Sequence, residues 1–483
     1  MRSGSRNWAK WVAAIAVGLA GCAQVHEPRP VDTPPPLQVV PVQPPGSTTP
    51  PRIPKAEPTS VRRASSVEVL VPAGQSDPPS TDVPTSAKLT ERDVIESVLR
   101  QNPTLTQMRA AAEAAQARYP QVTSLDDPMV TIWTAPGSYW SDHVDAAARA
   151  ELAQKLPWPG KRELRGQAAL AEASAAAREL EVARLDLIEA ARVALADYGL
   201  AERVLAVNKE SLELLALSRR NAETRVRNGL APQQDINQAN VELARQEERA
   251  VALERARKVA QARLNTLMHQ PPDAALPAPP DDAPTPTDLP DVASLRAKAT
   301  AARPDLKALA DRIRADEATA ALAEQEYKPD VEVMAAYDGF WQGTDRSLQW
   351  QIGARVNIPI QYARRDAAVA EARARVARRR AELAKLTDQI AFRVQEAAEQ
   401  VRESRKVIEL YEQKILPAAR ANVKEAQSAY MNAKVPFLNL AGAQRTLIEQ
   451  RERHLEAQAE LRRRWAVLDR LIGEPSDPAH GRP

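Results

Sequence analysis

The stretch from Pro159 to Asn228 limits what this chain can fold into more than any other part of the sequence. Between Lys161 and Asn228 it contains no proline and two glycines, and small or apolar residues recur three and four positions apart over many turns. This period predicts one uninterrupted helix, which at 1.5 Å per residue is roughly 100 Å long. A helix of that length must lie along other long helices or span a distance. Alanines in its apolar seam favour close packing between helices.

The N-terminus has the pattern of a secreted and lipidated protein. A basic start precedes the apolar segment Trp11–Ala20, which is too short to span a bilayer. Leu-Ala-Gly-Cys then ends at Cys22, the only cysteine, so no internal disulfide is possible. The pattern resembles the bacterial lipoprotein signal, which implies a signal peptide over 1–21 and lipidation of Cys22. Ala23, rather than Asp, follows the cysteine and by the same resemblance favours the outer membrane.

Composition excludes several classes of function. The 66 basic and 63 acidic residues give a net charge of +3, so the clustered basic excess of a nucleic-acid binder is missing. Aromatic residues make up 4% of the chain, which argues against a large globular β-core. The five histidines are scattered, and there is no phosphate-binding glycine loop or nucleophile elbow. We therefore expect no enzyme, cofactor or metal site, and we interpret the pairs Asp126-Asp127 and Asp281-Asp282 as turn residues.

The remainder of the chain repeats one pattern with an offset of just over 200 residues. Asn102-Pro103 returns as Arg303-Pro304, and Leu156-Pro157 returns as Ile358-Pro359. Each repeat has two short alternating stretches, which predict strands, and two long helices joined by a turn. The expected boundaries are a lipid-anchored Pro-rich tether over 22–88, a first repeat over 89–272 (strands 128–135 and 148–157, helices 160–228 and 233–268), a linker over 273–291, a second repeat over 292–473 (strands 331–339 and 348–358, helices 365–432 and 437–472) and a tail over 474–483.

Prolines and capping residues predict local details. Thr90, with Asp93 three positions later, predicts a capping box at the start of the structured part. Pro120 is expected to end a short helix, and Pro417 to kink the second long helix, because a proline removes a hydrogen bond and clashes with the preceding turn. Gly229 suits a left-handed helix end.

Two strands per repeat cannot form a stable sheet alone, and four strands with open edges cannot stand in a membrane. Every strand edge at bilayer depth must be paired. We therefore expect several copies of the chain to complete a closed barrel, and strands of about ten residues have the length that spans a bilayer.

At this level of detail the sequence resembles a TolC-type outer-membrane efflux protein of the lipoprotein kind. The resemblance covers roughly 89–473 and is carried by Ile415–Ala419, Ala429-Tyr430, Val435–Leu440, Ala443–Leu447 and Gln154–Pro157 with Gly160–Arg162. It implies a mainly α fold with a small β part, assembled as a homotrimer. A 12-stranded transmembrane β-barrel in outer-membrane lipid would continue into a periplasmic α-helical barrel. The implied partners are a periplasmic adaptor protein and an inner-membrane pump, with the resistance-nodulation-division type as one candidate.

The resemblance also implies functional positions. The adaptor would contact the tips of the helical hairpins at Asn228, Gly229 and Leu230 and at Asn432, Ala433, Lys434 and Val435. Alanine tolerates the left-handed conformation poorly, so we expect Asn432 to take that role in the second turn. Asp235 lies six positions after the turn glycine and is a candidate pore gate, because charged rings set selectivity in pores. Asn439 occupies the matching place in the second repeat, and the alternative for Asp235 is an ordinary first-turn helix acid.

The function implied is an exit duct for small toxic compounds or metal cations. The stretch Lys155–Arg162 is reminiscent of the metal-cation branch of the family, although the chain has few metal-ligating residues. Two alternatives belong to other classes. A non-channel coiled-coil scaffold lipoprotein would explain the helices but not the paired strands, and a lipid-anchored enzyme lacks a catalytic constellation.

Overall fold

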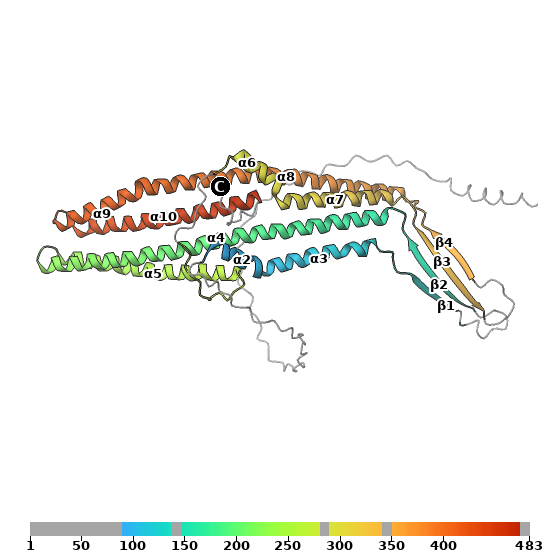
Figure 1. The fold of residues 1–483 in the computed structure, drawn as a ribbon, viewed down its shortest axis with the longest axis horizontal. Helices are drawn as coiled ribbons and strands as arrows, with labels where there is room; N and C mark the ends of the chain where they lie inside the picture. Colours follow the sequence, from blue (N-terminus) through green and yellow to red (C-terminus); the bar gives the residue numbers. More distant parts are fainter. Residues whose placement is uncertain (1–88, 135, 137–146, 281–288, 341–349, 474–483) are drawn as a thin grey trace, which may run out of the picture. The chain divides into compact units, whose positions relative to one another are not determined.

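The computed structural model describes residues 89–134, 136, 147–280, 289–340 and 350–473. The expected signal peptide, Cys22 and the tether lie outside the described residues, as do the tail and part of the linker. The described chain is mainly helical and contains one four-stranded sheet (Figure 1).

The first repeat begins with a capped helix. The Thr90 hydroxyl accepts a hydrogen bond from the Asp93 N–H (3.3 Å), and the Asp93 carboxylate accepts one from the Thr90 N–H (3.3 Å), which confirms the capping box. Asn102 ends this helix and caps the next one. The elements are α2 (Glu91–Gln101), α3 (Pro103–Thr123), β1 (Met129–Thr134), β2 (Ala147–Leu156), α4 (Lys161–Arg227) and α5 (Gln233–Leu267).

The second repeat follows the same order. Its elements are α6 (Val292–Ala302), α7 (Pro304–Gln325), β3 (Val331–Phe340), β4 (Trp350–Val356), α8 (Tyr362–Leu410), the π-helical turn η2 (Tyr411–Ile415), α9 (Leu416–Met431) and α10 (Phe437–Ile472).

One proline-based expectation needs correction, and the other stays a prediction with a local feature beside it. The second long helix is helical from Tyr362 to Met431 but contains the π-helical turn η2, where the Leu416 N–H bonds to the Tyr411 carbonyl five residues back. This wider turn ends two residues before Pro417, which has no N–H for the regular ladder. Pro120 does not end α3, which continues to Thr123. The Pro120 carbonyl still accepts a hydrogen bond from the Ser124 N–H (3.0 Å), so the helix gains one more turn.

Each repeat has its own apolar core where short helices cover long ones. In the first, α2 packs on α4 and α5 through a cluster that includes Val98, Tyr198 and Leu264. In the second, α6 packs on α8 and α10 through a cluster that includes Val394 and Leu468. Burial of such side chains stabilises the fold by about 1.5–3 kcal/mol each. These cores hold the long helices side by side, as Figure 1 shows.

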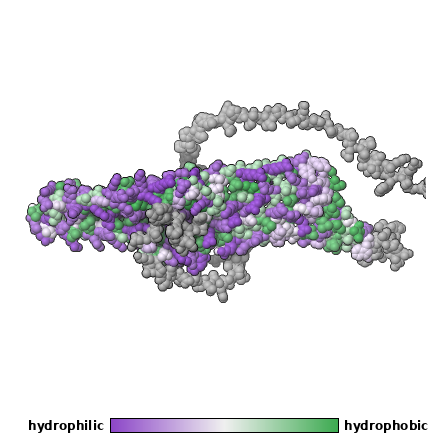
Figure 2. All heavy atoms as spheres, turned by 45° about the horizontal axis from the view of Figure 1, so that its top comes forward, coloured by the Kyte–Doolittle hydropathy of each residue, from purple (hydrophilic) through white to green (hydrophobic). Residues whose placement is uncertain are grey.

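The surface of the long helices is largely hydrophilic, whereas hydrophobic residues gather toward the sheet (Figure 2). Arginine–carboxylate pairs bridge neighbouring helices, for example Arg192 on α4 with Asp469 on α10 (2.9 Å) and Arg470 on α10 with Asp186 on α4 (2.6 Å). Among the described helices, none combines the length and the apolar character needed to cross a membrane.

The four strands form one antiparallel sheet in the order β1-β2-β3-β4. The pairing of β2 with β3 joins the two repeats, with Leu156 opposite Val331. Alternation of side chains in this register gives the sheet two different faces. One face is exposed and apolar; it carries Val130, Ile132, Leu152, Val333, Tyr337, Trp350, Ile352 and Val356. The other face is more polar; it carries Arg149, Glu151, Lys155, Glu332, Asp338, Gln351 and Arg355, together with Met129, Trp133 and Met334.

Candidate functional site

The turn between α4 and α5 closes the first helical hairpin with a left-handed glycine. Gly229 has a φ of 69°, and its N–H donates to the Val226 carbonyl (2.9 Å), while the Leu230 N–H donates to the Arg225 carbonyl (2.8 Å). This pair of bonds satisfies carbonyls that the helix end would leave free. Asn228, Gly229 and Leu230 are exposed, and Leu230 keeps 62% of its surface accessible. An apolar side chain is therefore presented at the hairpin tip.

The turn between α9 and α10 has the same geometry without a glycine. The Ala433 N–H donates to the Tyr430 carbonyl (3.0 Å), and the Lys434 N–H donates to the Ala429 carbonyl (2.9 Å). Ala433 takes the left-handed conformation with a φ of 56°, whereas Asn432 has a φ of −86°. The expectation that Asn432 would replace the missing glycine is therefore wrong. The two turn bonds fix the left-handed position whatever residue occupies it, and alanine bears the strain.

Behind these turns, each of the four long-helix ends contributes one side chain to a buried cluster, here called the tip cluster. Its members are Arg225, Asp235, Tyr430 and Phe437, from α4, α5, α9 and α10. All four are buried, with Phe437 at 0% and Asp235 at 5% exposed. The cluster therefore joins both hairpins just inside their turns.

A hydrogen bond between the hairpins lies at the centre of the tip cluster. The Tyr430 hydroxyl donates to Oδ2 of Asp235 (3.1 Å), and the Tyr430 ring meets the Phe437 ring edge-on at 5.5 Å. The Arg225 guanidinium lies 4.8 Å from the centre of the Tyr430 ring and donates to the Met431 carbonyl across the gap (2.7 Å). Burial, followed by the charge of Asp235, raises the pKa of Tyr430 to about 12. Tyr430 therefore stays a neutral donor at physiological pH.

This arrangement changes what is expected of Asp235. The carboxylate does not project freely from a single chain, since it is buried and bound to Tyr430 of the other hairpin. Its role as a pore gate stays a prediction, but the structure links it to a contact that would have to break if the hairpins separated. Asn439, at the matching place on α10, is exposed.

The sequence did not single out Arg225 or Tyr430 as functional residues. The available signal was their position: Arg225 lies four residues before Gly229, and Tyr430 lies three residues before Ala433. Residues at these spacings from the two turns face one another in the paired hairpins. Recognising them requires the relative placement of α4 and α9, which no local pattern contains.

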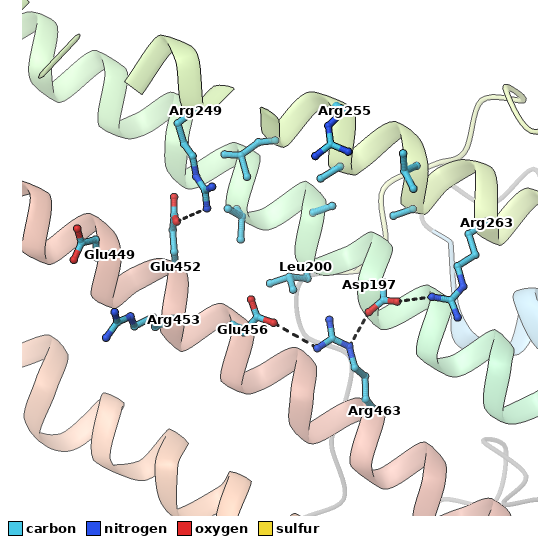
Figure 3. Close-up of a pocket in the computed structure, with 16 residues that line it drawn as sticks. Asp197, Leu200, Arg249, Arg255, Arg263, Glu449, Glu452, Arg453, Glu456 and Arg463 are labelled. Carbon is cyan, nitrogen blue, oxygen red and sulfur yellow. Dashed lines mark hydrogen bonds and ion pairs between the residues drawn. The ribbon is translucent and has the colours of Figure 1, made fainter. Parts of the chain in front are cut away.

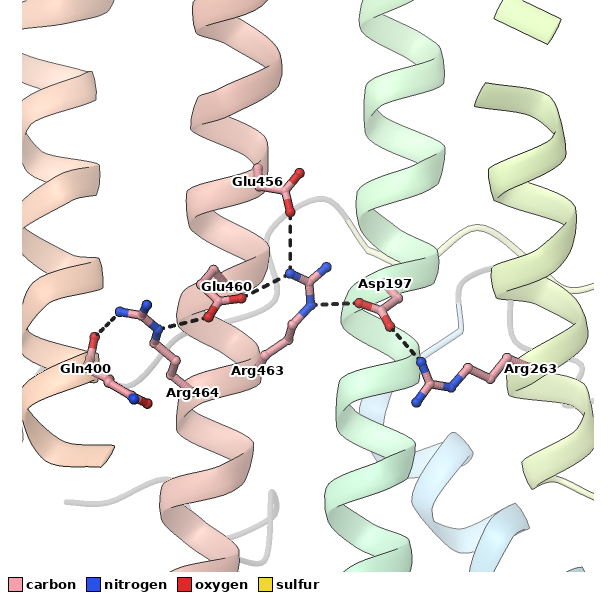
Figure 4. A network of polar contacts seen from close by, with 7 residues as sticks. All are labelled: Asp197, Arg263, Gln400, Glu456, Glu460, Arg463 and Arg464. Carbon is pink, nitrogen blue, oxygen red and sulfur yellow. Dashed lines mark hydrogen bonds and ion pairs between the residues drawn. The ribbon is translucent and has the colours of Figure 1, made fainter. Parts of the chain in front are cut away.

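Farther from the tip, a network of charged side chains also ties the first hairpin to the second (Figure 4). Asp197 on α4 binds Arg463 on α10 (2.7 Å) and Arg263 on α5 (3.4 Å). Glu460 bonds to Arg463 (3.1 Å) and Arg464 (2.9 Å). Burial raises the pKa of Glu460, but the hydrogen bonds from the two arginines outweigh this and hold the pKa below its usual value. The network fixes the helices together away from the turns.

A pocket of about 650 Å³ lies beside this network, between α4, α5 and α10 (Figure 3). Its apolar lining includes Leu200, Val204 and Leu253, and Arg249 pairs with Glu452 at its edge (3.1 Å). Acidic and basic residues alternate around it, so it has no strong preference for either charge. Within the described part of the chain, no group of three or more His, Cys, Asp or Glu residues is placed to hold a metal ion.

Comparisons with known proteins agree on the fold of the described chain. Residues 295–474 match the family model described as outer membrane efflux protein. The solved structure of the outer-membrane channel OprN has a TM-score of 0.68 at 20% identity, covering 79% of this chain and 89% of that one. The outer membrane protein VceC from Vibrio cholerae has a TM-score of 0.69 at 20% identity, covering 80% and 97% of the two chains. The outer membrane channel MtrE from Neisseria gonorrhoeae has a TM-score of 0.66 at 17% identity, covering 79% and 88%.

The described chain thus has the fold of TolC-type outer-membrane channels. Comparison with curated protein sequences finds no significant match.

Proposed function

We propose that the protein is the exit duct of a tripartite efflux or secretion system and works as a homotrimer. The two-faced sheet is the observation that carries this proposal. Ile352 is 88% exposed on the apolar face, whereas Arg355 on the opposite face pairs with Glu332 (2.7 Å). A sheet of this kind suits lipid on one side and water on the other. The non-channel scaffold offers no reason for such a sheet.

The number of copies follows from the edges of the sheet. Within the described strands, β1 and β4 each have one edge without a partner. Open edges are unfavourable in hydrocarbon because their N–H and C=O groups find no water. Three copies with four strands each would close a 12-stranded transmembrane barrel, and the long helices would extend from it into the periplasm.

The tip cluster is the proposed gate. The bond between Tyr430 and Asp235 and the contact of Arg225 with the Met431 carbonyl hold the two hairpins together near their turns. The proposed adaptor contact lies just beyond, on Asn228, Gly229 and Leu230 and on residues 432–435. Docking of an adaptor there would separate the hairpins and break the tip cluster. The network around Asp197 would still hold α4, α5 and α10 together farther from the turns.

The proposed anchor is a lipidated Cys22 in the outer membrane. Acyl chains contribute about 0.8 kcal/mol per buried methylene, so several chains together hold a protein firmly. Small toxic compounds and metal cations remain the proposed cargo. The pump, with the resistance-nodulation-division type as one candidate, would select it.

Channel recording of the purified full-length protein tests this proposal. We expect a trimer in detergent that produces stepwise conductance in planar lipid bilayers and restores drug or metal resistance to cells that lack their own duct but keep an adaptor and a pump. A protein that inserts no channels and remains unassembled in detergent would be the coiled-coil scaffold instead.

A further inference from the structure

The two repeats make the same contact at the junction between helix and sheet. In the first repeat, Nε of Arg162 donates to the Thr123 carbonyl (2.8 Å); in the second, Nε of Arg365 donates to the Glu326 carbonyl (2.8 Å). Donor and acceptor are each displaced by 203 positions. At this junction, therefore, the offset between equivalent residues is 203.

A second contact at this junction crosses from one repeat to the other. Lys161, at the start of α4, is buried to 1% exposure. Its Nζ lies 2.9 Å from Oδ1 of Asp330 and 3.4 Å from Oε2 of Glu326, and it donates to the Lys328 carbonyl (3.1 Å). Asp330 lies directly before β3, so the ion pair fastens the first repeat to the second beside the pairing of β2 with β3.

The same offset applied to this pair leads to two residues that have no such partner among the described residues. Lys161 corresponds to Arg364, and Asp330 corresponds to Asp127. Arg364 and Asp127 are exposed, and no ion pair or side-chain hydrogen bond engages either within the described part of the chain. Asp127 lies shortly before β1 and Arg364 follows β4, which are the two outer strands of the sheet. The chain thus carries half of the contact at each edge.

The strand register supports the same equivalence. Thr131 on β1 lies opposite Glu151, on the polar face of the sheet, and an offset of 203 maps it to Met334, which lies on that face as well. An offset of 202 would map it to the apolar face. Thr131 pairs with Glu151, and its equivalent Met334 pairs with Gly353. Glu151 therefore corresponds to Gly353, and β2 corresponds to β4 with an offset of 202.

We propose that a second copy of this chain docks its β1 edge along β4, with Arg364 of the first copy bound to Asp127 of the next. This inference rests on the proposed assembly of several copies and names the residues that meet. Gln154 lies opposite Val333 and Leu152 opposite Ala335 at the internal junction. The offset of 202 takes Gln154 to Val356, and the offset of 203 takes Val333 back to Val130, so Val356 would lie opposite Val130 of the next copy. In the same way, Ala354 would lie opposite Ile132 of the next copy. All four are exposed on the apolar face.

The helices give independent support. At the internal junction α7 packs along α4 and buries several residues, among them Leu306 and Ile313. In α3, the equivalent helix of the first repeat, Leu105 is the buried residue. A next copy in the proposed register brings its α3 against α8 and covers the helix that the single chain leaves exposed.

Disulfide cross-linking of the full-length protein tests the register. Directly opposite Cα atoms in antiparallel strands lie about 4.5–5.5 Å apart, within disulfide range, whereas diagonal pairs lie about 7–8 Å apart. We expect the double variants Val356→Cys/Val130→Cys and Ala354→Cys/Ile132→Cys to form chains cross-linked up to the trimer on a non-reducing gel. The displaced pairs Val356→Cys/Ile132→Cys and Ala354→Cys/Val130→Cys should not. Cys22 stays in place, and the single-cysteine variants report any cross-link that it makes.

Charge exchange tests the ion pair. Arg364→Glu or Asp127→Arg alone should reduce the fraction of trimer that survives in detergent, and the double variant should restore it. Asp126→Arg, next to the proposed partner, is the matched control and should leave the trimer unchanged. Two results would overturn this inference while the duct proposal stands. One is that Asp126→Arg, rather than Asp127→Arg, restores the trimer of Arg364→Glu. The other is that the displaced cysteine pairs cross-link within an intact trimer. A wild-type chain that never assembles would overturn both.

Discussion

Tyr430 and Asp235 are 195 positions apart in the chain, yet the hydroxyl of one donates to the carboxylate of the other at 3.1 Å. The contact joins α9 to α5, and both residues are buried. A buried carboxylate that loses its donor costs about 1–3 kcal/mol. This bond therefore favours the paired arrangement of the hairpin tips, and it is the most direct target for loosening them.

We expect Tyr430→Phe to open the tip, because it removes the hydroxyl and keeps the ring that packs on Phe437. In planar bilayers the single-channel conductance should rise, and Asp235→Ala should have the same direction of effect. Tyr411→Phe, in the π-helical turn, is the control, since within the described residues no hydrogen bond engages the Tyr411 hydroxyl. Equal conductance in wild type, Tyr430→Phe and Asp235→Ala would show that the gate lies elsewhere.

The Tyr430 side of the tip contact should make it depend on pH in the alkaline range. The pKa of Tyr430 is raised from about 10 to about 12 in the folded protein, so the folded state retains the proton more strongly than the unfolded one. The stabilisation is complete below pH 10 and is lost as the pH rises toward 12. Tyrosinate absorbance during titration should show late-ionising tyrosines, including Tyr198 at about 12. Tyr430→Phe should remove one of them, and an unchanged late step would contradict the assignment.

The two faces of the sheet should respond differently to a charge. Arginine at Val130 or Ile132, on the exposed apolar face, is expected to cost about 2–4 kcal/mol near mid-bilayer. Arginine at Thr131, on the polar face, should be tolerated. Trimer yield in the outer membrane and the denaturant midpoint of the purified trimer measure the difference. Equal tolerance at all three positions would place β1 outside the membrane.

The sequence alone predicted most of the elements because their signals are local. The long apolar period predicted α4, and the alternation from Met129 to Thr134 predicted β1. What it did not predict depends on contacts between distant segments. The buried pairing of Tyr430 with Asp235 requires two hairpins to meet, and Lys161 gives no sign in the sequence that it is enclosed by Asp330.

Prolines, and the absence of a glycine from the second turn, were less reliable guides, because the surrounding helices can absorb their effects. Two residues before Pro417 a π-helical turn ends, and at Pro120 the helix continues through its last turn. At Ala433 the hydrogen bonds of the turn outweigh the preference of the residue. Each of these outcomes depends on a balance of about 1–3 kcal/mol that a sequence pattern does not display.

The left-handed conformation of Ala433 leads to a prediction with opposite signs at the two turns. An L-residue with a side chain is strained there by roughly 1–2 kcal/mol, and glycine is not. Ala433→Gly should therefore stabilise the second hairpin by about 1 kcal/mol, offset in part by the greater freedom of glycine in the unfolded chain. Gly229→Ala should destabilise the first hairpin by a similar amount, although no atom lies within 4 Å of an added Cβ. Hydrogen exchange of amides near each turn measures both effects locally. If Ala433→Gly accelerates exchange near its turn, the left-handed strain at Ala433 is not what limits the stability of that tip.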